Sequence, residues 1–127
     1  MKRDMELIRK ILFKIEEEVD NLTVYDLEVD GYSMDQVAYH CSLLYDGGLI
    51  KDYEAQEADD ELDGFIIDGL TWYGHEFLDD IRSDTVWDKT KETIKTNGLP
   101  MVFDVVKEIA KAFISATTQA AIKGIMN

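Results

Sequence analysis

The sequence has a single cysteine, a single proline and no long apolar run, and each scarcity excludes a class of protein. With Cys41 alone, the chain can form neither an internal disulfide nor a cysteine-based zinc cage. No stretch approaches the ~20 apolar residues that span a bilayer, and the amphipathic start does not resemble a signal peptide. We therefore expect a cytoplasmic protein with no membrane segment.

Basic residues are scarce in the middle of the chain. Residues 16–84 contain 21 acidic side chains but only Lys51 and Arg82, whereas the two ends carry small positive balances. The net charge of −14 is therefore concentrated in this middle part. At the same time 46% of the 127 residues are hydrophobic, which is enough for a folded core.

Apolar residues spaced three and four apart predict five helices. The first spans residues 4–19, with Asp4 as its N-cap. The second spans residues 33–46, because Ser33 and Gln36 have the spacing of a capping box. Its inward-facing residues are expected to be Val37, Ala38, Cys41, Leu44 and Tyr45.

The remaining helices lie in the second half of the chain. Thr71 is the expected N-cap of one helix, and Ser83 or Asp84 caps the next, which stops at residues 97–98. The last helix is predicted to begin at Pro100, a residue favoured at the first helical position.

Alternating apolar and polar residues predict three strands. A short strand is expected over residues 23–29. A strand that starts with residues 49–53 and a returning strand at residues 65–67 are expected to form a hairpin with a long acidic loop, whose polar tip is residues 59–64.

The order helix, short strand, capped helix, hairpin, helix is typical of winged-helix domains. We predict an α+β fold with a winged-helix-like core over residues 1–82, in which the β-hairpin forms an acidic wing. Residues 83–127 are predicted to be a C-terminal helical extension. Little room is left before Ser33 for the usual second helix, so the helix-turn-helix element is expected to be abbreviated.

Several segments of the sequence resemble the family grouped as domain of unknown function 2513. The resemblance rests on residues 1–12 (MKRDMELIRKIL), 31–33, 39–40, 48–50, 70–72, 74–79 and 81–82, and on Trp87 with the lysines after it. It implies a small bacterial protein, often associated with prophages. It implies no activity, cofactor or catalytic residue.

Recognition of DNA normally needs Lys and Arg side chains that displace counterions from phosphates. The predicted helix at residues 33–46 has neither, and the predicted wing is acidic. The first hypothesis is therefore a non-enzymatic protein-binding module whose acidic face resembles DNA and engages a basic partner, such as a nucleic-acid-binding or host-defence protein. The predicted partner-binding residues are Asp35, Gln36, Tyr39, His40, Leu43, Asp46, Asp59, Asp60, Glu61 and Asp63.

Two alternatives come from other classes. One is a dimeric winged-helix transcriptional regulator that binds DNA through basic residues near the two ends of the chain. The other is a structural or assembly protein. A simpler interpretation of the acidic surface is that it only keeps a small protein soluble. An enzyme is not expected, because no nucleophile is paired with a base, and no cofactor is implied.

Two acidic motifs resemble metal sites incompletely. Residues 59–64 resemble the first half of a calcium loop, but Leu70 stands where the bidentate carboxylate belongs. Residues 75–79 place Asp79 where a zinc-protease helix has its second histidine. We therefore predict no metal site.

The other chemically distinctive side chains are expected to be structural. Cys41 lies on a buried face without a cation that would activate it. Trp72 and Trp87 are expected to be core or interface anchors, and His75 is expected to pack near Trp72 or to cap a hydrogen bond.

The predicted C-terminal helix has an unusually wide apolar face, which one small domain cannot cover completely. We expect it to mediate a homodimer. The alternatives are a helix folded back onto its own core and a membrane-surface helix, which the sparse lysines of the helix disfavour. The predicted dimerisation residues are Val102, Val106, Ile109, Phe113, Ala116 and Ala120.

Overall fold

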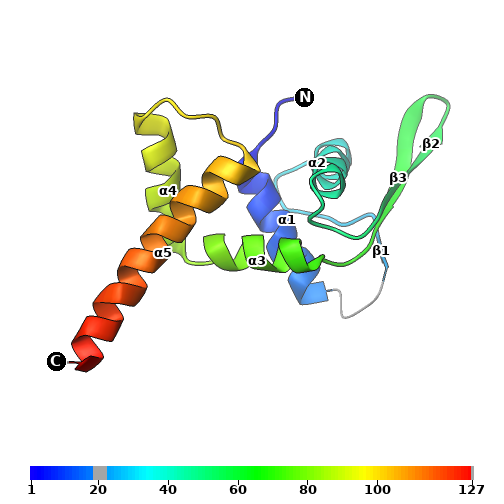
Figure 1. Ribbon diagram of the computed structural model, residues 1–127. Coiled ribbons are helices and arrows are strands. Elements are labelled where there is room, and N and C mark those ends of the chain that lie inside the picture. The colour runs from blue at the N-terminus through cyan, green and yellow to red at the C-terminus, as the bar shows by residue number, and fades with distance from the viewer. Residues whose placement is uncertain (19–22, 127) are drawn as a thin grey trace. The chain divides into compact units, whose positions relative to one another are not determined.

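The computed structural model describes residues 1–18 and 23–126, and these form helices and one small antiparallel sheet (Figure 1). The α+β class predicted from the sequence is confirmed. Two compact units are present, Met1–Leu78 and Asp79–Asn127. The elements are α1 (Met5–Glu18), β1 (Val24–Tyr25), α2 (Met34–Asp46), β2 (Tyr53–Ala58), β3 (Glu61–Ile67), α3 (Trp72–Ile81), α4 (Asp84–Thr96) and α5 (Phe103–Met126).

The first unit packs α1 and α2 together beside a sheet with the strand order β1-β3-β2. Both neighbouring pairs are antiparallel, and Ile67 is opposite Val24 on one side and Tyr53 on the other. The apolar stripe of α1 is fully buried, as its three-and-four spacing predicts. Phe65 and Ile67 of β3 are also completely buried, so the central strand supplies the sheet's part of the core.

Helix caps inferred from the sequence are confirmed. The Asp4 carboxylate accepts the N–H groups of Glu6 and Leu7 at 2.9 and 3.3 Å, so it caps α1. At α2, Ser33 and Gln36 form a complete capping box. Val19, the predicted end of the first helix, lies outside the described residues.

The inward face of α2 is largely as predicted. Four of the five expected residues are buried, but Tyr45 is 44% exposed, and its predicted burial is wrong. Gly48, just after the helix, has a φ of 77°, a left-handed conformation that glycine adopts without a steric penalty.

The strand predicted over residues 23–29 is wrong in its second half. Asp26 adopts a left-handed backbone with φ 50°, and its N–H donates to the Phe65 carbonyl at 2.8 Å. The Asp26 carboxylate then accepts the Phe65 N–H, also at 2.8 Å. The Asp26 side chain thus accepts the Phe65 N–H in place of a strand carbonyl, and the backbone leaves the sheet after Tyr25. Leu27 and Val29 are nevertheless buried, so the alternation marks a buried loop rather than a strand.

The hairpin differs from the prediction at both ends. Ile50 forms only an isolated bridge with Leu70, and regular pairing begins at Tyr53 rather than at residue 49. β3 is longer than predicted, because it begins at Glu61 rather than at residue 65. The Lys51 N–H donates to the Gly69 carbonyl at 2.9 Å, so the two segments of the hairpin stay in contact beyond the end of the regular ladder.

The start of α3 is fixed against the chain that follows α2. Thr71 donates its N–H to the Leu49 carbonyl at 3.0 Å and its hydroxyl to the Gly48 carbonyl at 2.6 Å. The same hydroxyl accepts the Gly74 N–H at 3.0 Å, so Thr71 is the N-cap that the sequence predicts. A Cβ atom at Gly74 would lie 2.0 Å from the Leu49 carbonyl oxygen, so only glycine fits this approach.

The second unit is built on the packing of α4 against α5. Ser83 rather than Asp84 caps α4, because its side chain accepts the Val86 N–H. The predicted stop is also confirmed, since Asn97 is the C-cap of α4. The predicted start of the last helix is wrong: Pro100 precedes α5, whose first residue is Phe103.

We predict that Gly74→Ala destabilises the first unit by about 3 kcal/mol, because the added methyl group collides with backbone that side-chain rotation cannot move. Urea unfolding followed by circular dichroism measures the change. Gly124→Ala is the matched control, since nothing lies within 4 Å of the Cβ it would add. Equal stability of the two variants would contradict the close approach of α3 to Leu49.

Candidate functional site

The solvent-facing side of α2 carries part of the predicted partner-binding surface. Asp35 and Asp46 are exposed near the two ends of the helix, while Gln36, Tyr39 and Leu43 are half-buried between them. Positions about four apart lie on one side of an α-helix, so these residues form one stripe. The stripe contains two carboxylates and no basic side chain.

His40 was predicted on this surface, but it is 2% exposed. Its Nε2 accepts the Asp4 N–H at 2.8 Å, and its Nδ1 lies 2.7 Å from the Gln36 carbonyl oxygen. The first bond requires an unprotonated Nε2, so Nδ1 carries the hydrogen and donates to Gln36. His40 therefore ties the start of α1 to α2 and is not available to a partner.

The β2–β3 hairpin is the second part of the predicted surface, and its turn end extends away from the helices of its unit (Figure 1). Ala58 is opposite Glu61, which leaves only Asp59 and Asp60 in the turn. Their φ values of 55° and 64° match a type I′ turn, which follows the natural twist of a hairpin. The long acidic loop expected from the sequence is thus a two-residue turn.

Most of this hairpin is exposed to solvent, and its exposed strand residues include four acidic ones, Glu54, Glu57, Glu61 and Asp63. Every residue of β2 after Tyr53 is exposed, and so are Glu61 and Asp63 at the start of β3. The register opposes Glu57 to Leu62 and Glu54 to Ile66. No two carboxylates of the described ladder are therefore directly opposite each other, which limits the repulsion within the hairpin.

A register shift at the middle of the hairpin places Asp63 between the paired positions. Gln56 is opposite Gly64, whereas the next residue, Glu57, is opposite Leu62. Such a bulge increases the local twist and changes the direction of the exposed side chains. Asp59, Asp60, Glu61 and Asp63 are all exposed, so the structure brings these four predicted residues together at one end of the hairpin.

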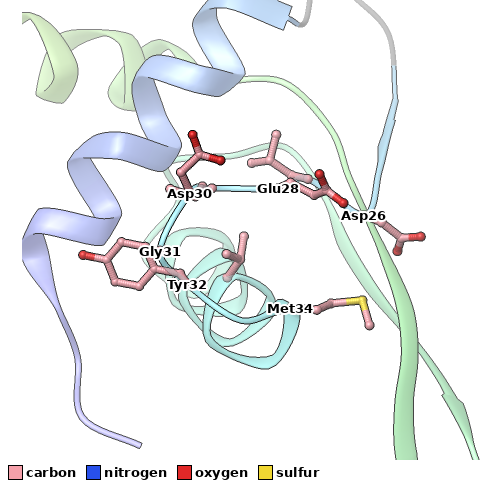
Figure 2. A pocket seen from close by; sticks show the side chains of 9 residues that line it. Asp26, Glu28, Asp30, Gly31, Tyr32 and Met34 are labelled. Atoms are coloured by element: carbon pink, nitrogen blue, oxygen red, sulfur yellow. The ribbon is translucent and has the colours of Figure 1, made fainter.

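A hollow of about 310 Å³ lies between residues 26–32 and the start of α2. Figure 2 shows Asp30 and Tyr32 on one side of it and Asp26 and Met34 on the other. The sequence did not point to these acidic residues as one group, since residues 23–29 were expected to be a strand.

Asp26 in this hollow has a structural role. Its carboxylate holds β3, and a Cβ atom at Gly64 would lie only 2.8 Å from Asp26 Oδ1. The exposed carboxylates of Glu28 and Asp30 are also part of the hollow's lining, beside Met34 and Val37 of α2. They extend the acidic surface of the first unit.

The predicted dimerisation face of α5 is divided. Val106 is fully buried, and α4 packs against α5, so this residue belongs to the folded chain's own core and its predicted role is wrong. Val102, Ile109 and Phe113 are half-buried, and Lys89 Nζ lies 6.0 Å from the centre of the Phe113 ring. Beyond them, Ala116 and Ala120 are exposed.

The tryptophans and His75 differ in position. Trp87 is 2% exposed, whereas Trp72 is 79% exposed at the first turn of α3. The Trp72 indole N–H donates to the Glu76 carboxylate. His75, expected to pack near Trp72, is exposed, and the hydrogen-bond partner of the indole is Glu76 instead.

In residues 1–18 and 23–126, no group of three His, Cys, Asp or Glu side chains is placed to hold a metal ion. Residues 59–64, the calcium-like motif, lie along the turn and the first half of β3. No helix within these same residues has the length and apolar character needed to cross a bilayer.

Comparisons with known proteins agree with the resemblance found in the sequence. Residues 2–100 match the family described as hypothetical protein DUF2513. The chain is also similar to an uncharacterized protein of Haemophilus influenzae (strain ATCC 51907 / DSM 11121 / KW20 / Rd), with 38% identity over 116 residues, or 91% of this chain and 97% of the relative. No solved structure matches the chain. The family match ends before α5 begins.

Cys41 gives a pH-dependent test of the core on which α2 rests. Burial raises the pKa of the thiol from 9.0 to about 12. Below pH 9 the thiol is protonated in both states, but between pH 9 and 12 only the unfolded chain loses the proton. We predict that the free energy of unfolding falls with rising pH in this window, by up to about 1.4 kcal/mol per pH unit from this thiol.

Urea unfolding at pH 8, 9, 10 and 11 measures this dependence. Cys41→Ala is the control, because it keeps every other titrating group and removes the thiol. The wild-type curve should therefore fall more steeply than that of the variant above pH 9. Parallel curves would show that the thiol is accessible to water in the folded state.

Proposed function

The chain belongs to the DUF2513 family, and we propose that it is a non-enzymatic protein-binding module whose acidic hairpin and α2 surface engage a basic partner. The partner's chemistry follows from the charge: a surface of this kind complements a cationic groove that otherwise holds a phosphate backbone. In this proposal the protein imitates DNA rather than binding it. The single observation that carries the proposal is the cluster of exposed carboxylates at the turn end of the β2–β3 hairpin.

Charge distribution favours a protein partner over DNA. Between Lys51 and Arg82 the sequence contains no lysine or arginine, and both the hairpin and the start of α3 lie in this range. α2 contains none either. A duplex brought to this surface would meet carboxylates without the cations that supply most of the binding energy. A basic protein would instead be attracted, and its association would be accelerated.

We also propose that the first unit is a variant winged-helix domain. The order α1, β1, α2, β2, β3 and the sheet order β1-β3-β2 support this interpretation. In it, residues 26–32 replace the usual second helix, α2 takes the place of the reading helix, and the hairpin is the wing. The surface proposed to bind a partner is then the one that related domains present to DNA.

The decisive experiment is affinity capture from a lysate of the native host, followed by competition with duplex DNA. We predict that the wild-type chain retains a basic protein that duplex DNA displaces. The variant Asp59→Asn, Asp60→Asn, Glu61→Gln, Asp63→Asn should recover about tenfold less of it, equivalent to ~1.4 kcal/mol. Asparagine tolerates the left-handed conformation of the turn, so this variant keeps the hairpin fold.

A matched control removes the same number of charges elsewhere. Glu17→Gln, Glu18→Gln, Asp88→Asn, Glu92→Gln changes four exposed acids outside the hairpin and should capture the partner normally. Equal losses in both variants would mean that only net charge matters. Failure to capture any protein that DNA displaces, together with a gel shift of random duplex at about 50 mM salt reversed near 200 mM, would favour the transcriptional regulator instead.

We further propose that the last half of α5 forms a homodimer. Residues 109–126 contain no acidic side chain, so two copies of a chain with a net charge of −14 approach each other there with the least repulsion. Ile122 is 49% exposed and Ile125 is 84% exposed, and we place them at the centre of the contact. The face predicted from the sequence, which includes Ala116 and Ala120, lies on a different side of α5. That side continues from the part of the helix that packs against α4.

We predict that Ile122→Glu, Ile125→Glu halves the mass measured by light scattering, because a carboxylate cannot be buried unpaired in the interface. Both positions are exposed, so the fold should not change. Ala116→Glu, Ala120→Glu is the control with the same charge change, since residues 120 and 122 lie about 200° apart around the helix. A monomeric wild-type chain would refute the dimer, and dissociation only by the control would place the interface on the face predicted first.

A further inference from the structure

The first turn of α3 is held rigidly on the surface of the first unit. Thr71 bonds to both Gly48 and Leu49, and Gly74 lies directly against the Leu49 carbonyl. The backbone between these two contact points carries Trp72. Its position is therefore fixed by the fold before any ligand arrives.

Trp72 is unusual because its indole is almost completely exposed although the chain contains a large core. Its exposed fraction is 79%, compared with 2% for Trp87. An aromatic side chain buries about 150–250 Å² of surface in a typical core, and an exposed indole loses the stabilisation that this burial gives. Tryptophan is also strongly enriched among the residues that dominate the energy of protein interfaces.

Glu76 gives the exposed ring a charged companion. The two residues are one helical turn apart, and the Trp72 indole N–H donates to the Glu76 carboxylate. This bond limits rotation of the indole and keeps a carboxylate at the edge of its ring. Asp46, which is exposed, lies two residues before Gly48, the acceptor of the Thr71 hydroxyl. The chain around this turn thus carries negative charge.

We propose that Trp72 and Glu76 together form a receptor for an arginine side chain of the partner protein. The guanidinium stacks on the indole face while its N–H groups donate to the Glu76 oxygen that the indole leaves free. This inference rests on the proposed function only for the basic character of the partner, and it adds a contact outside the hairpin.

Arginine fits this pair better than lysine. A guanidinium is planar, stacks on aromatic faces and presents several donors in one plane, whereas an ammonium is a compact and strongly hydrated charge. An acidic side chain is excluded by Glu76 itself. The pair therefore selects both the sign of the charge and the shape of the group that carries it.

The test titrates the ¹⁵N-labelled full chain with acetylated hexa-arginine amide and follows the indole N–H signals in NMR spectra. Trp72→Phe assigns the signal of Trp72, and the buried Trp87 supplies an internal reference. The Trp72 signal should shift and saturate with hexa-arginine. It should shift less with hexa-lysine at equal concentration and stay in place with hexa-glutamate.

Two variants divide the receptor into its parts. Glu76→Gln removes the charge but keeps an oxygen that accepts the indole N–H, and it should weaken hexa-arginine binding about three- to fivefold. Trp72→Ala removes the ring and should weaken binding by a similar factor, measured from the backbone signals of α3. Equal affinity of both variants and the wild type would overturn the proposal, as would equal responses to hexa-arginine and hexa-lysine.

The hairpin variant separates this inference from the proposed function. With Asp59, Asp60, Glu61 and Asp63 neutralised, the Trp72 signal should still shift with hexa-arginine, because the receptor lies on α3. If the Trp72 signal moves only when the hairpin is acidic, the receptor does not exist as a separate contact. If Trp72 does not respond but the hairpin signals do, the receptor is refuted and the proposed function stands.

Discussion

The hydrogen bonds around Leu49 hold the first unit together, because they join segments that precede and follow the hairpin. The Leu49 N–H donates to Leu44 at the end of α2, and its carbonyl accepts Thr71 at the start of α3. The adjacent bridge between Ile50 and Leu70 closes the base of the hairpin. Because both ends of the hairpin are fixed at this point, its exposed part can extend into solvent with little core of its own. The acidic turn therefore extends from a base that the bonds at Leu49 and the Ile50–Leu70 bridge hold in place.

Concentrated negative charge opposes compact folding, and the structure accommodates it in two ways. Most carboxylates of the hairpin face water, where their mutual repulsion is screened by salt, and the register opposes Glu54 and Glu57 to apolar partners. The core beneath is mainly aliphatic and aromatic, and among the residues that the structure describes the buried polar ones are His40 and Thr90 rather than any Asp, Glu, Lys or Arg. The resulting surface combines high charge with an ordered backbone. In the proposed function, those two properties allow the surface to occupy a cationic groove that otherwise holds DNA.

Local patterns predicted the helices well, because caps such as Ser33 with Gln36 depend on neighbours within one turn. Features set by distant partners were not predictable in the same way. Asp26 ends β1 through a bond to Phe65, 39 residues away, and His40 is withdrawn from the surface by Asp4, 36 residues away. The residues next to Asp26 and His40 in the sequence give no indication of these distant partners. The hairpin tip was missed for another reason, since two consecutive aspartates are not the usual sequence of a tight turn.

The strand order β1-β3-β2 leaves one side of β2 without a neighbouring strand among the described residues. Backbone N–H and carbonyl groups on such an edge can pair with the same edge of another molecule. Glu54 and Glu57 of β2 are exposed, so at neutral pH two copies paired along this edge would bring like charges together, which opposes the pairing. Near pH 4.3 the net charge expected from the sequence is zero, so the overall repulsion between two copies is weakest there while the edge remains. Acidification should therefore promote intermolecular strand addition and aggregation, so storage well above this pH keeps the polypeptide dispersed.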